Sequence, residues 1–138
     1  MPICIWPYHC IKGTKGIELE ENLAKTIEKY APIFIRKGMD SYTEMFGIIK
    51  PEYNPDNYIN KEVLDLIESH EQVYIAGEAK SHCVLRTIEQ IIEYFENQPE
   101  ILERITILEN CMSSITGYEE QTENKFKEFE KYKIRFIK

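Results

Sequence analysis

Apolar residues follow two alternating patterns along the chain, which together predict a succession of strands and helices. Spacings of three and four, which place apolar residues on one helix face, predict helices over 17–30, 60–69, 81–97 and 119–132. Short apolar runs between turn residues predict strands over 3–6, 32–35, 72–76, 105–108 and 134–137. Residues 39–60, which contain Gly47, Pro51 and Pro55, read mainly as loop. One face of the first predicted helix carries Leu19, Leu23, Ile27 and Tyr30. The side chains expected to face the core from the next two helices are Val63, Leu64, Ile67, Val84, Ile88, Ile91, Ile92 and Phe95.

This order of elements predicts an α/β fold: a mostly parallel sheet of five strands in a three-layer α/β/α arrangement. Ligands bind such sheets beyond the carboxyl ends of the strands. Three loops carry unusual residues at these ends, namely residues 6–10, Lys37 and residues 77–83. We therefore expect these loops to converge on one edge of the sheet.

Composition narrows the class of protein. The chain has 138 residues, 43% of them hydrophobic, which is enough for the core of one domain. A net charge of -7 argues against a nucleic-acid partner. No run of 18 apolar residues and no basic leader is present, so we expect neither a membrane partner nor a signal peptide. Four cysteines without a CxxC pair predict reduced thiols in the cytoplasm.

Cys83 is the first candidate for chemistry, because it lies between a predicted strand and a predicted helix. A thiol in the first turn of a helix meets the positive end of the helix dipole, which favours the thiolate, and nearby backbone N–H groups can hold an oxyanion. The alternative is an inert cysteine buried on the apolar side of the helix.

Lys37 and His9 are the next candidates. Lys37 directly follows an apolar run and could stabilise a thiolate, or it could be a solvated loop lysine. His9 could bind a metal, or it could be a hydrogen-bonded loop histidine. A structural zinc held by Cys4, His9 and Cys10 does not have the spacing of a zinc knuckle or ribbon.

Trp6, Tyr42 and His82 fall at the same predicted edge and could line a pocket for a flat ring. Core packing is the alternative for Trp6, and surface exposure is the alternative for His82.

Three ordered motifs resemble those of the nicotinamidases and pyrazinamidases, in the isochorismatase-like cysteine hydrolase superfamily. Residues 6–19, WPYHCIKGTKGIEL, resemble W-P-x-H-C-x-x-G-T-x-G-x-x-L. Lys37-Gly38 followed by Tyr42-Thr43 resembles a K-G…Y-[ST] segment, and residues 77–87, GEAKSHCVLRT, resemble G-x-A-T-x-x-C-V-x-x-T. Residues 108–111 take the place of a strand that ends in an acidic segment.

The resemblance implies an amidase that converts nicotinamide to nicotinate and ammonia through a thioester. It implies Cys83 as nucleophile, Lys37 as the lysine of the catalytic triad, and the N–H groups of Ala79 and Cys83 as the oxyanion hole. The bond between Glu78 and Ala79 would match a cis peptide of the family. His9 would be one ligand of a divalent metal, zinc in the first instance, while Trp6, His82 and Tyr42 would line the substrate pocket.

The sequence departs from the family in two respects. The resemblance calls for a triad aspartate and a D-x-H metal-ligand segment ahead of Trp6, whereas the first aspartate is Asp40. We therefore expect residues 1–138 to be the C-terminal portion of a single hydrolase domain that is a poor catalyst by itself. We also expect it to form a homo-oligomer or a complex with a complementing N-terminal chain. Lys80 replaces the usual threonine, which could be subgroup variation or could change the substrate. Another isochorismatase-like hydrolase and a truncated, non-catalytic subunit are the alternative functions.

Overall fold

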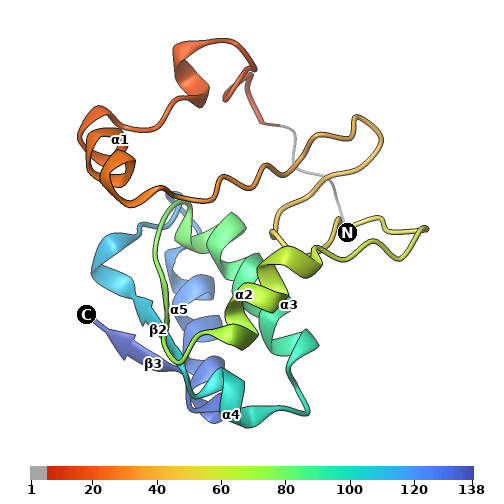
Figure 1. The fold of residues 1–138 in the computed structure, drawn as a ribbon, viewed down its shortest axis with the longest axis vertical. Coiled ribbons are helices and arrows are strands. Elements are labelled where there is room, and N and C mark those ends of the chain that lie inside the picture. Colours follow the sequence, from red (N-terminus) through yellow and green to blue (C-terminus); the bar gives the residue numbers. More distant parts are fainter. Residues whose placement is uncertain (1–5) are drawn as a thin grey trace. The chain divides into compact units, whose positions relative to one another are not determined.

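A computed structural model describes residues 6–138 (Figure 1). The chain divides into two compact units, Met1–Ile35 and Arg36–Lys138. Most of the strand predicted over 3–6, with Cys4, lies outside the described residues. Within the described part of the chain, none of the helices has the length and apolar character needed to cross a membrane.

In the described part of the first unit there is one α-helix, α1 (Glu21–Ile27), between 3-10 turns at Lys15–Ile17 and Glu28–Tyr30. The side chain of Glu20 caps α1 by accepting hydrogen bonds from the N–H groups of Asn22 and Leu23. The predicted helix over 17–30 is thus confirmed over residues 21–30. Two of the apolar side chains on its predicted face are largely exposed, Leu23 at 49% and Tyr30 at 77%.

The predicted strand over 32–35 is wrong. Residues 31–40 contain no helix or strand. An apolar run becomes a strand only when a neighbouring strand accepts and donates its backbone hydrogen bonds, and Pro32 also lacks an N–H group.

The second unit is built on a parallel sheet of three strands, β1 (Val73–Ile75), β2 (Ile105–Leu108) and β3 (Arg135–Ile137), in the order β1-β2-β3. All three strands were predicted. Ile75, Ile107 and Phe136 lie side by side across the sheet and point to one face. The parallel sheet with its connecting helices confirms the predicted α/β class.

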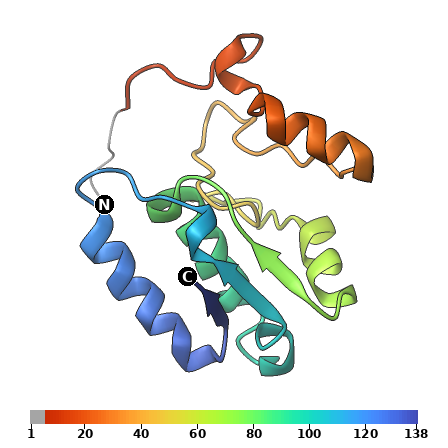
Figure 2. The ribbon, with the colours of Figure 1, turned by 90° about the vertical axis from the view of Figure 1, so that its left-hand side faces the viewer.

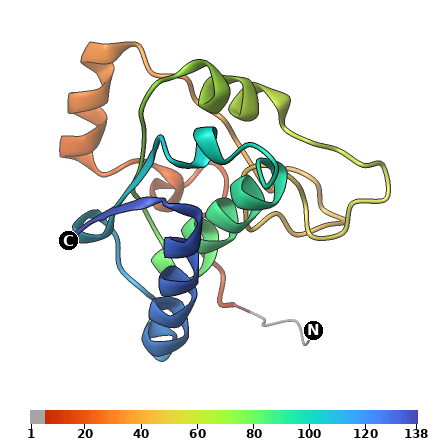
Figure 3. The same ribbon diagram turned by 90° about the horizontal axis from the view of Figure 1, so that it is seen from below.

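Four helices accompany this sheet: α2 (Lys61–Ser69), α3 (Leu85–Tyr94), α4 (Pro99–Leu102) and α5 (Glu119–Phe129). Because parallel strands are joined by right-handed crossovers, α3 and α5 lie on the same face (Figures 2 and 3). On the opposite face Tyr74 is 57% exposed and Ile137 is 47% exposed. The second unit therefore contains two of the three predicted layers.

The core lies between the sheet and these helices. All five side chains predicted to face inward from the 81–97 helix are buried, as are Leu64 and Ile67 of α2. Phe126 and Phe129 of α5 complete the same cluster. Asn60 caps α2, as predicted, by accepting a hydrogen bond from Val63 N–H at 3.4 Å.

Candidate functional site

Cys83 lies in a turn that joins β1 to α3. The chain leaves β1, passes through a cis peptide bond between Glu78 and Ala79, and enters a π-helical turn at Lys80–Val84. Val84 N–H donates to the carbonyl oxygen of Ala79 at 3.1 Å, which closes this turn. The turn continues into α3, so the half-buried Cys83 lies at the N-terminal end of a helix, where the dipole favours a thiolate.

The structure brings Lys37 to Cys83, although 46 positions separate them in the chain. The Nζ atom of Lys37 lies 3.5 Å from Cys83 Sγ and donates a hydrogen bond to the carbonyl oxygen of Met45 at 2.8 Å. Both side chains are partly buried. A cation at this distance stabilises a thiolate. The two segments expected to converge therefore bring the amine of Lys37 to a position where it can stabilise a charged Cys83 sulfur.

Gln90 fixes the loop that follows Lys37, and it was not predicted as a site residue. Its side chain, on α3, is 1% exposed. Gln90 Oε1 accepts hydrogen bonds from Ile49 N–H at 3.0 Å and Lys50 N–H at 3.3 Å, and its Nε2 donates to Lys50 O at 2.7 Å. A Cβ atom at Gly47 would lie 2.2 Å from Gln90 Oε1, so a larger residue at this position would displace the Gln90 amide from its hydrogen bonds. The helix that begins near Cys83 thus also holds the loop beyond Lys37.

His82 precedes the thiol and is half-buried, not simply a surface residue. Its Nδ1 atom lies 2.8 Å from Ser81 Oγ, and its ring packs edge-on against Tyr118 with the ring centroids 4.6 Å apart. Burial lowers the pKa of His82 below 6.5, so its imidazole is neutral at neutral pH.

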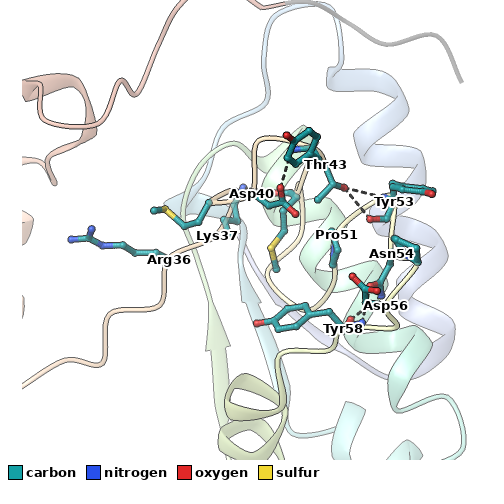
Figure 4. A pocket seen from close by; sticks show the side chains of 14 residues that line it. Arg36, Lys37, Asp40, Thr43, Pro51, Tyr53, Asn54, Asp56 and Tyr58 are labelled. Atoms are coloured by element: carbon teal, nitrogen blue, oxygen red, sulfur yellow. Dashed lines mark hydrogen bonds between the residues drawn. The ribbon is translucent and has the colours of Figure 1, made fainter.

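Tyr42 lines a cavity of about 540 Å³ formed by residues between 36 and 58 (Figure 4). Lys37 also lines this cavity, and Tyr53 and Tyr58 contribute aromatic rings. The side chain of Tyr42 is 91% exposed, and its N–H group donates to Asp40 Oδ1 at 2.9 Å. The cavity therefore adjoins the lysine of the Lys37–Cys83 pair and has the size of a small-molecule site.

Trp6 and His9 belong to the first unit, so the contacts described above join residues of the second unit alone. The Nδ1 atom of His9 lies 2.6 Å from the carbonyl oxygen of Pro7. No group of three His, Cys, Asp or Glu side chains suited to a metal ion occurs among residues 6–138. The residues described do not by themselves form a metal site, and the roles of Trp6 and His9 stay predictions.

The similarity of this chain to known proteins lies in its structure. No family model and no curated protein matches the chain. The yeast nicotinamidase Pnc1p, bound to the inhibitor nicotinaldehyde, matches with a TM-score of 0.73 and 19% identity over 96% of this chain and 57% of its own. An Acinetobacter baumanii nicotinamidase/pyrazinamidase matches with a TM-score of 0.72 and 21% identity, over 97% of this chain and 59% of its own.

A pyrazinamidase of Pyrococcus horikoshii, solved in complex with zinc, has a TM-score of 0.62 and 20% identity, over 97% of this chain and 63% of its own. The chain thus spans 57% to 63% of the length of these three structures. Sequence identities this low establish the fold alone. The chain has the α/β, isochorismatase-like fold of the nicotinamidases and pyrazinamidases, as its three motifs predicted.

Proposed function

We propose that this chain carries the nucleophile of an amidase-type cysteine hydrolase that converts nicotinamide to nicotinate and ammonia. The main support is the distance of 3.5 Å between Lys37 Nζ and Cys83 Sγ, at the start of a helix in a nicotinamidase-like fold.

The first half of the proposed reaction forms a thioester. The thiolate of Cys83 attacks the carboxamide carbon, a C–S bond forms, and the carbonyl electron pair moves onto oxygen. The N–H groups of Ala79 and Cys83 stabilise this oxyanion. When the carbonyl re-forms, the C–N bond breaks, and the nitrogen takes up the proton that the thiol had lost and leaves as ammonia.

The second half releases the acid. Water adds to the thioester carbon and gives up one proton, the C–S bond breaks, and the sulfur leaves with its electron pair as the Cys83 thiolate. The proton given up by water then restores the Cys83 thiol, and the other hydrogen of the water stays on the acid. Lys37 stabilises the thiolate before attack and after release, because its ammonium group lies beside the sulfur in both states. The sum is one amide and one water converted to one acid and one ammonia.

The substrate class follows from the predicted pocket residues. We propose that His82 contacts the flat ring and that Tyr42 contributes from the rim of the cavity beside Lys37, while the role of Trp6 stays a prediction from the sequence. A neutral His82 suits contact with an uncharged ring. Production of nicotinate would place the protein in NAD salvage in the cytoplasm.

A divalent metal held partly by His9 is a separate proposal, and zinc is the first metal to test because the Pyrococcus horikoshii structure is a zinc complex. The reaction above uses only residues of this chain and water. Metal content of the purified protein, measured by mass spectrometry of wild type and His9→Ala, tests this point independently of activity.

The activity test is ammonia release from nicotinamide and pyrazinamide, with isochorismate and unrelated amides as alternative substrates. We expect Cys83→Ala to abolish release and Cys111→Ala, at an exposed free cysteine, to leave it unchanged. Turnover should be slow, since the structure offers Lys37 Nζ the partners Met45 O and Cys83 Sγ, neither of them a carboxylate, and a missing general base costs about 10²- to 10⁴-fold. A preference for another substrate would favour a different isochorismatase-like hydrolase.

A further inference from the structure

Lys80 is buried, although it begins the turn that carries Cys83. It is 6% exposed, and its Nζ donates to Glu109 Oε2 at 2.8 Å and to the carboxylate of Glu123. The same atom lies 4.6 Å from the centroid of the Phe126 ring. A cation at the start of a helix faces the positive end of the dipole, so helix electrostatics do not favour a lysine here.

The ionisation of Lys80 depends on its two partners. Burial alone would lower the pKa of Lys80, but the hydrogen bonds and charges of Glu109 and Glu123 together outweigh burial and raise the pKa. Lys80 is therefore an ammonium at neutral pH and joins the start of the turn to two other elements. These are the 3-10 turn Glu109–Cys111, which follows β2, and α5.

Residues 109–115, which we call the support segment, hold the same turn through further bonds. Ser113 N–H donates to the carboxylate of Glu78 at 3.1 Å, and Ser113 Oγ donates to it at 3.0 Å. Lys80 N–H donates to Ser113 O at 2.8 Å, and Ile115 N–H donates to Ser81 Oγ at 3.0 Å. The residues on both sides of Ala79 are thus hydrogen-bonded to the support segment.

We propose that Lys80 is a positioning residue that, with Glu109 and Glu123, holds this turn so that the N–H groups of Ala79 and Cys83 meet the substrate oxyanion. The proposal rests on the proposed function, in which these two groups stabilise the oxyanion. The family motif has threonine at this position, and a threonine hydroxyl is too short to join carboxylates on two elements.

The distance between the N–H donors and the substrate oxyanion explains why holding this turn would affect the rate of acyl transfer. Oxyanion donors act when they lie about 2.7–3.1 Å from the developing charge, and loss of one donor costs about 10²- to 10³-fold in kcat. A displacement of about 1 Å at a reacting group can cost about 10²-fold. Thiolate formation at Cys83 depends instead on Lys37 and the helix dipole. Loss of the Lys80 contacts should therefore slow acyl transfer much more than simple alkylation.

The first arm of the test measures amide hydrogen exchange in wild type and Lys80→Met, each checked for folding by circular dichroism. We expect exchange at residues 80–84 to become at least about tenfold faster, while α2 keeps its wild-type rates. Lys80→Met leaves Glu109, whose side chain is 11% exposed, without its cation. The double variant Lys80→Met/Glu109→Gln removes both charges and provides a second folded protein. Lys125→Met, which breaks an exposed ion pair with Glu128 on α5, is the matched control.

The second arm compares two reactions of Cys83. Iodoacetamide alkylates the thiolate without forming an oxyanion. p-Nitrophenyl nicotinate acylates it through one, forming a C–S bond and expelling p-nitrophenolate with the electron pair of the broken C–O bond. We expect Lys80→Met to reduce acylation by about 10- to 100-fold and to change alkylation by less than about threefold. Lys125→Met should change neither rate.

Each outcome decides a different point. Unchanged exchange at residues 80–84 in both Lys80 variants would overturn the claim that Lys80 holds the turn. Faster exchange with equal losses of acylation and alkylation would overturn the claim that it positions the oxyanion hole. If wild-type Cys83 is acylated no faster than Cys111, the proposed function fails, and the exchange arm alone decides whether Lys80 holds the turn.

Discussion

Removal of the Lys37 charge should make Cys83 less reactive, and the structure sets the size of the effect. At 3.5 Å two unit charges interact by about 1 kcal/mol in water and by about 5 kcal/mol at an effective dielectric constant of 20. Both groups are partly exposed, so we take about 1–2 kcal/mol as the attraction between the two charges. Lys37→Met should therefore remove about 1–2 kcal/mol of the electrostatic stabilisation of a negatively charged sulfur, which corresponds to a factor of about 5 to 30.

The alkylation rate should fall by less than this factor, because a sulfur anion without a neighbouring cation is intrinsically more nucleophilic. With a Brønsted coefficient of about 0.4–0.5, the net loss in alkylation rate at pH 7 is about two- to eightfold. The assay is substoichiometric iodoacetamide labelling followed by peptide mapping. In wild type, the peptide that contains Cys83 should be labelled faster than those that contain Cys10 or Cys111, the exposed free cysteines.

Lys37→Arg keeps the charge, and Lys61→Met removes the charge of an exposed lysine on α2, so both should leave labelling of Cys83 nearly unchanged. Equal alkylation rates in wild type and Lys37→Met between about pH 6 and pH 9 would refute the argument. Cys83 would then be reactive, if at all, through the helix dipole alone.

Three further predictions concern stability and assembly. Gln90→Leu should lower the free energy of unfolding by about 2–4 kcal/mol in urea titrations, because it removes the hydrogen-bond partners of the Ile49 and Lys50 backbone groups. A loss of unfolding free energy no larger than that caused by a surface substitution would contradict the role given to Gln90. The pKa of His82 is lowered on folding, so its contribution to stability is present above about pH 6.5 and is lost as pH falls through the folded value. His82→Gln should therefore unfold with a weaker dependence on pH between about 7 and 5 than wild type, and equal slopes would count against this. Because β1 and β3 are the outer strands of the described sheet, we expect sedimentation to show a homo-oligomer or a complex with a complementing chain, and a monomer at high concentration would argue against it.

Local patterns predicted most of the second unit. Apolar spacing, which involves only residues close together in the chain, predicts the helices that contain Leu64, Ile88 and Phe126. α4, with four residues, is too short to show a period, although Pro99 at its start is a typical first helical residue. The strand expected over 32–35 fails because strand formation depends on a partner, which apolar character alone does not supply.

The site was predictable only in part from the topology. The turn that carries Cys83 follows β1, at the edge of the sheet where ligand-binding loops are expected. Lys37 follows no strand, so the reason first given for expecting it near Cys83 does not hold, although the two side chains do meet. Gln90 and Lys80 could not be identified, because their roles depend on partners far away in the chain. A lysine is usually exposed, and the burial of Lys80 requires carboxylates 29 and 43 positions later.

The proposed reaction depends most directly on a covalent bond between Cys83 and the substrate. Rapid acid quenching of the protein with nicotinamide, followed by peptide mass spectrometry, should detect a nicotinoyl thioester on the peptide that contains Cys83. The adduct should be removed by hydroxylamine, and in Cys83→Ala both adduct and ammonia release should be absent. Ammonia release that persists in Cys83→Ala at the wild-type rate would contradict the central claim.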